Sequence, residues 1–136
     1  MGEETGADVV EAPSLDEIMS WSGYRLDEVA GGSVGKVEGA YVDADSGRAE
    51  WLLARMGRFG HHCLVPARDA VAGAGHVWVP YGRDRIRQAP KIEPRTELNR
   101  EKELELLSFY GIDGEVGRAA EVAGRDAEAV TARPAA

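Results

Sequence analysis

Hydrophobic and polar positions alternate in short runs through the middle of the chain. Between Lys36 and Asp43 the pattern places Val37 and Tyr41 on one face, which is the two-residue period of a β-strand. Asp43 to Gly47 then supplies Asp, Ser and Gly, residues that favour a reversal of the chain. A second alternating run, Arg48 to Met56, follows directly. The pattern therefore predicts a β-hairpin.

Both faces of the second predicted strand carry apolar side chains. Leu52, Ala54 and Met56 face one way. Trp51 and Leu53 face the other way, and an apolar patch of this kind is rarely left exposed on a monomer. Two elements could cover this patch, either a C-terminal helix of the same chain or a partner. A two-fold contact through Trp51 and Leu53 would suit the second, since homodimers are common and aromatic residues concentrate in their interfaces.

Further short strands are predicted beyond this hairpin. They are His61 to Val65, His76 to Tyr81, and Arg83 to Gln88, where three arginines alternate with other residues. No helical period separates one strand from the next. About six short antiparallel strands with tight links favour a mainly β fold, and we expect a small β-barrel.

Two segments carry helix signals. Ser14 and Glu17 stand three residues apart, as in a capping box, and predict a short helical turn. Leucines and aromatic residues recur every three or four positions from Glu97 to Tyr110, and Gly111 follows as a helix terminator, so a C-terminal helix is predicted. The expected organisation is a disordered acidic leader at 1–13, the barrel with its helical turn at 14–96, the helix at 97–112 and a disordered tail at 113–136.

The charge of the chain is unevenly distributed. The 136 residues carry a net charge of -8, and the first 23 contain six acidic residues and no Lys or Arg. The middle of the chain is close to neutral by comparison. A nucleic-acid binder needs several uncompensated cations, so this distribution makes nucleic acid an unlikely partner.

Sequence features also bear on the compartment. No apolar stretch reaches the roughly 20 residues that a membrane span requires, and Glu3 and Glu4 stand where a secretory signal would be basic. The one cysteine, Cys63, fits a reducing environment. We expect a cytoplasmic protein without a membrane span, although a membrane-associated protein remains among its potential partners.

The candidate metal ligands are few. His61 and Cys63 stand two residues apart and would share one face of a strand, whereas His62 would point away. His76 would have to arrive from the next strand to supply a third ligand, and a zinc site requires three or four. These three residues form a weak metal-site candidate. No group of residues amounts to a catalytic constellation, so we expect neither an enzyme nor a cofactor.

One basic cluster stands out. Arg83, Arg85 and Arg87 would share a face of the predicted strand, with Lys91 and Arg95 nearby. Such a row would suit phosphates or an acidic peptide. The alternative is a solvated edge strand whose charges prevent aggregation.

Three sequence runs resemble the PRC-barrel family. They are RLDEVAGGSVGKVEGAYVDADSGRAEWLLARM, HHCLVPARDAV and HVWVPYGRDRIRQAPKI, and together they cover roughly half of the chain. This fold is known from the cytoplasmic domain of the photosynthetic reaction centre H subunit and from the C-terminal half of a bacterial ribosome-maturation factor. The leucine-rich helix ending in Tyr110-Gly111-Ile112 looks like that of stand-alone bacterial members. The family has no shared catalytic residues, so the resemblance implies a contact surface.

The functional expectation follows from these points. We expect a non-enzymatic interaction or assembly module, acting as a homodimer or with a protein partner through Trp51, Leu53, Arg83, Arg85 and Arg87. One alternative is a role in RNA binding or ribosome assembly, by similarity to the ribosome-maturation factor. A second alternative is a barrel that binds a small molecule or a metal.

Overall fold

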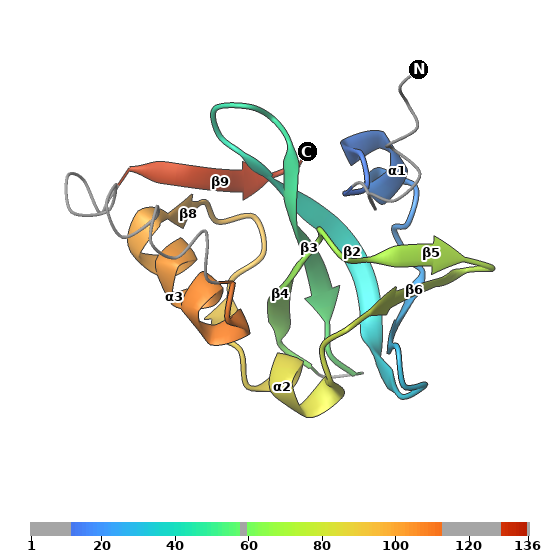
Figure 1. Cartoon of the computed structure of the whole chain (residues 1–136). Helices are drawn as coiled ribbons and strands as arrows, with labels where there is room; N and C mark the ends of the chain where they lie inside the picture. The colour runs from blue at the N-terminus through green and yellow to red at the C-terminus, as the bar shows by residue number, and fades with distance from the viewer. Residues whose placement is uncertain (1–11, 58–59, 113–128, 136) are drawn as a thin grey trace, which may run out of the picture.

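The structure is mainly β, as predicted. The computed structural model describes residues 12–57, 60–112 and 129–135 (Figure 1). Its nine strands form one sheet in the order β5-β6-β1-β2-β3-β4-β7, with β9 joining β2 to β8. The strands are β1 (Arg25–Glu28), β2 (Ser33–Asp43), β3 (Ala49–Arg55), β4 (His62–Pro66), β5 (Val71–Gly73), β6 (His76–Val79), β7 (Lys91–Ile92), β8 (Leu98–Asn99) and β9 (Val130–Pro134).

The number and direction of the strands differ from the prediction of about six antiparallel ones. Three of the additional strands, β7, β8 and β9, are short and lie near or within segments without clear alternation. In addition, β1 pairs parallel with β6, with Arg25 opposite His76. A parallel pair joins segments far apart in the chain, so no local sequence pattern predicts it.

The predicted hairpin is present as β2 and β3. The two strands pair antiparallel, with Tyr41 opposite Trp51 and Lys36 opposite Arg55. Gly47 in the turn has φ 76°, a conformation that favours glycine. Gly35 lies so close to the Arg55 carbonyl that any side chain there would collide with it, so glycine allows the two strands to meet at this end.

Two predicted helices are also present. Helix α1 (Leu15–Met19) begins at the Ser14–Glu17 capping box, and its Ile18 side chain is buried. Helix α3 (Arg100–Tyr110) ends at Gly111, which is left-handed with φ 71°. It begins later than Glu97 because Leu98 and Asn99 pair with β9, and the Asn99 side chain then accepts a 2.8 Å hydrogen bond from the Lys102 N–H.

The prediction of a strand at Arg83 to Gln88 was wrong, because this segment is helix α2 (Arg83–Arg87). The Ile86 N–H donates to the Gly82 carbonyl at 3.0 Å, which is the helical bond pattern. Ile86 is the one apolar side chain between residues 83 and 88. The alternation of arginines with other residues therefore could not distinguish the period of a strand from that of a helix. Arginine is moreover a good helix former.

The prediction of a disordered tail was wrong for β9. Its Ala132 has no exposed surface, and β9 pairs with both β2 and β8. In Figure 1 it lies alongside β8, next to the start of α3. A five-residue strand in an Ala- and Arg-rich stretch is too short to show a period, so tertiary pairing decides its conformation. Residues 1–11 of the predicted leader and 113–128 of the predicted tail lie outside the described residues.

Candidate functional site

The predicted Trp51 contact surface is covered by the chain's own C-terminal helix. Trp51 is only 2% exposed, and its ring lies 6.3 Å from that of Tyr110 on α3. Its indole N–H donates to Glu103 Oε2 at 3.4 Å. Leu53 is half-buried and packs against the core. Of the two coverings left open by the sequence, the helix is the one present, and Trp51 is not available to a partner.

The three arginines of α2 do not share one face. The Arg85 guanidinium lies 5.8 Å from the Tyr81 ring centre and 5.9 Å from those of Phe109 and Tyr110. It donates to the Phe109 carbonyl at 3.0 Å and so satisfies a group at the C-terminal end of α3. Arg83 and Arg87, one helical turn apart, lie on another side of α2. Arg85 therefore joins α2 to α3, and the predicted row of three is divided.

The candidate metal ligands are not brought together. Cys63 lies on β4 and His76 on β6, and β1, β2 and β3 separate these strands in the sheet. Burial raises the pKa of the Cys63 thiol, so the reactive thiolate form is disfavoured. The part of the chain that the structure describes contains no cluster of three or more His, Cys, Asp or Glu side chains suited to a metal ion.

The sheet instead aligns five basic residues that the sequence analysis did not connect. Arg25 lies opposite both Lys36 and His76, Lys36 lies opposite Arg55, and Arg55 lies opposite His62. Directly opposed residues point to the same face of a sheet. These residues form a row across β6, β1, β2, β3 and β4, which we call the basic row: His76, Arg25, Lys36, Arg55 and His62.

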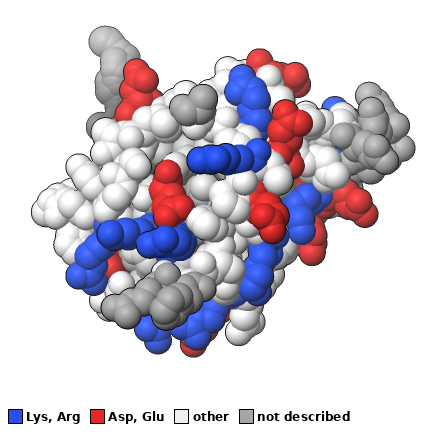
Figure 2. Space-filling view, turned by 180° about the vertical axis from the view of Figure 1, so that it is seen from behind, with Lys and Arg blue, Asp and Glu red and all other residues white. Residues whose placement is uncertain are grey.

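The basic row lies on the outer face of the sheet. The neighbouring residues Leu26, Val37 and Ala54 point inward and have no exposed surface, whereas Arg25, Lys36 and Arg55 are exposed. Figure 2 shows one face of the molecule, on which basic and acidic side chains interleave. The register of the strands therefore determines which basic residues are neighbours on this face, whereas their order in the sequence does not.

Two carboxylates pair with the basic residues on either side of Lys36 in the basic row. Asp27 accepts from His76 Nδ1 at 2.7 Å and lies 3.6 Å from Arg25. Glu38 lies 2.8 Å from His62 Nε2 and 3.4 Å from Arg55 Nε. Each acid therefore binds one histidine and one arginine. Lys36, at the centre, makes no ion pair with any residue that the structure describes.

One end of the basic row meets an apolar patch at the edge of the sheet. The His76 and Trp78 rings stack at 5.6 Å with an interplanar angle of 13°. Val71 on β5 lies opposite Trp78 and is 57% exposed. β5 is at the end of the strand order and pairs with β6 alone among the described strands. The β5–β6 hairpin projects from the body of the molecule on the right of Figure 1.

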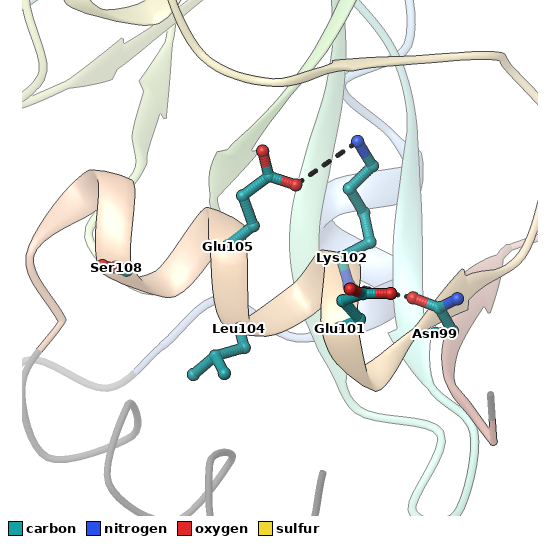
Figure 3. Close-up of a pocket in the computed structure, with 6 residues that line it drawn as sticks. All are labelled: Asn99, Glu101, Lys102, Leu104, Glu105 and Ser108. Carbon is teal, nitrogen blue, oxygen red and sulfur yellow. Dashed lines mark hydrogen bonds and ion pairs between the residues drawn. The ribbon is translucent and has the colours of Figure 1, made fainter. Parts of the chain in front are cut away.

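A hollow on α3 is the other feature of the surface (Figure 3). It measures about 640 Å³ and is lined by Asn99, Glu101, Lys102, Leu104, Glu105 and Ser108. Lys102 and Glu105 form an ion pair at 3.5 Å, and Asn99 caps the helix. The described residues that line it all belong to one helix and its cap, and among them no side chain faces the helix from another element.

Comparison with known proteins does not extend these observations. Neither the protein-family models nor the curated proteins include a match to this chain. No helix of the described segments combines the length and the apolar character required to cross a membrane.

Proposed function

We propose that the protein is a non-enzymatic interaction and assembly module with a PRC-type barrel fold, and that it forms a homodimer through the edge of its sheet at β5. The observation that carries this proposal is the exposed Val71 beside Trp78 on an edge strand. The family part rests on the resemblance of the three sequence runs, and a mainly β fold with a late helix is what that resemblance implies.

The physical basis of the contact is the free edge of β5. An edge strand presents unpaired backbone N–H and C=O groups that can pair with another strand. Antiparallel pairing of β5 with its own copy is two-fold symmetric, so one patch serves both subunits and the assembly closes. Val71 would then be buried against the edge of the partner subunit. Because β5 is short, it can form few backbone hydrogen bonds with its copy, so the burial of Val71 would be needed to stabilise the contact.

Light scattering behind size exclusion tests this contact. The full chain is expected to have about twice the mass of the 14.6 kDa monomer, and Val71→Glu is expected to be a monomer. Val130→Glu is the matched control, because Val130 is also an exposed valine but lies on β9, which pairs with β2 and β8. A monomeric full chain, or a dimer that tolerates Val71→Glu, would contradict the proposal.

A further inference from the structure

We propose that Arg25, Lys36 and Arg55, the central residues of the basic row, bind a phosphate group displayed by a partner polypeptide. This site is separate from the β5 edge and does not rest on the proposed dimer. It lies on the outer faces of β1, β2 and β3, where these residues oppose one another in register.

The spacing of the three residues suits one tetrahedral anion. Neighbouring strands lie about 4.8 Å apart, so the backbones of Arg25 and Arg55 are separated by about 10 Å with Lys36 between them. All three side chains are exposed and long. Their charged ends can therefore approach a single group from both sides and from below.

The electrostatics of the row favour an added anion. Like charges directly opposite each other on neighbouring strands repel, and here three cations stand in sequence. Asp27 and Glu38 balance the two outer cations and leave Lys36 unbalanced within the described residues. A phosphomonoester carries about -1.5 to -2 charges, so it can interact with all three cations, whereas a carboxylate carries one.

Neighbouring carboxylates lie beside both arginines of the site. Glu38 engages Arg55 through Nε, so the two terminal nitrogens of that guanidinium keep their donors for a ligand. Asp27, which is 6% exposed and hydrogen-bonded to His76, lies 3.6 Å from the Arg25 guanidinium. Because Glu38 orients Arg55 before binding, less of its side-chain entropy is lost when the phosphate arrives.

The open face indicates how the phosphate is presented. Sites for small free ligands are concave and enclose most of the ligand, whereas this row lies on an exposed sheet face. A phosphate carried by a polypeptide gains further contacts from its own chain. An extended nucleic acid requires several uncompensated cations, and here two carboxylates compensate the row and the chain carries a net charge of -8.

Amide NMR titration of the full chain tests the site, with inorganic phosphate added at constant ionic strength. We expect saturable shifts confined to β1, β2 and β3 around Arg25, Lys36 and Arg55. A peptide containing phosphoserine between glycines is expected to bind more tightly than inorganic phosphate, and the same peptide with serine is expected to produce no saturable shift. Lys36→Gln should weaken phosphopeptide binding by about tenfold or more.

Lys91→Gln is the matched control, since Lys91 is an exposed lysine on β7 outside the basic row, and it should leave the affinity unchanged. Absence of saturable shifts, or shifts that are unchanged in Lys36→Gln, would overturn the proposal. Tighter binding of an oligouridylate than of the phosphopeptide, with the same Lys36 dependence, would also overturn it in favour of RNA. The light-scattering result is independent of all these outcomes, so failure of this site and failure of the dimer are distinguishable.

Discussion

At the scale of single residues, the charged side chains of the outer face take their roles from the strands beside them. Glu38 on β2 joins an arginine on β3 and a histidine on β4, whereas Asp27 joins a histidine on β6 to Arg25 of its own strand. Lys36 stands between two arginines without such a partner in the described part of the chain. An arrangement that opposes like charges lowers stability unless an anion binds to it, which is the reason for assigning a binding role to the row.

Replacing Lys36 by threonine is expected to raise the free energy of unfolding by about 0.2–1 kcal/mol. The change removes a cation from between Arg25 and Arg55, and threonine suits a strand. Urea denaturation at low ionic strength measures the gain, which should shrink as salt screens the repulsion. Lys91→Thr, on β7 opposite Cys63, lacks opposed cations and should show no such salt-dependent gain. A loss of stability in Lys36→Thr would contradict this account of the row.

At the scale of elements, α3 is attached to the sheet by a few aromatic and polar contacts. The Tyr110 hydroxyl donates to the Leu64 carbonyl at 2.8 Å, and its ring meets Trp51 and Tyr81. Arg85 joins the end of the same helix to α2. These contacts explain why the apolar outer side of β3 needs no partner.

The Tyr110 hydroxyl should make stability depend on pH in alkaline solution. Burial, with the neighbouring Cys63 and Tyr81 as smaller causes, raises the pKa of Tyr110 well above that of a free phenol. In the unfolded chain the phenol ionises near pH 10, while the folded state keeps it neutral. Its contribution is therefore complete below about pH 10 and is lost as the pH rises further.

Tyr110→Phe is expected to cost about 1 kcal/mol near pH 7, because the Leu64 carbonyl loses its donor. Above pH 10 the variant should lose stability less steeply than the parent chain. Burial also raises the pKa values of Tyr41 and Tyr81, so part of the alkaline loss remains. Urea denaturation at several pH values from 7 to 11 gives the two slopes, and identical slopes would show that Tyr110 ionises as readily in the folded state.

At the scale of the whole molecule, the C-terminal strand joins the sheet beside the central hairpin. β9 lies beside β2 and also pairs with β8, so a segment near the end of the chain contacts its middle. Ala132 of β9 is buried and belongs to the hydrophobic core. The fold is therefore not complete at the end of α3.

Ala132→Asp is expected to lower the free energy of unfolding by about 3 kcal/mol or more, because an aspartate there would be buried without a partner among the core residues around it. Arg133→Asp is the control, since residue 133 is the exposed neighbour on the same strand. Thermal unfolding followed by circular dichroism compares the two variants. Equal midpoints would mean that β9 is not docked in the way described.

Local patterns identified the β2–β3 hairpin, the capping box of α1 and the terminating glycine of α3. In each case the signal and the structure lie within a few residues of each other, because turns, caps and amphipathic periods are local interactions. Within the basic row, only the pairing of Lys36 opposite Arg55 follows from such a local signal, since one turn connects their strands.

Tertiary structure decided the rest. Residues 83–88 are compatible with either period and became a helix, and Val130–Pro134 acquired its conformation from β2 and β8. Likewise, Arg25, His62 and His76 join the basic row through pairings between segments separated in the chain. The sequence by itself therefore determined a mainly β fold with its hairpin and the helices α1 and α3. The strand register determined the surface, because register between distant segments depends on how their buried faces pack together.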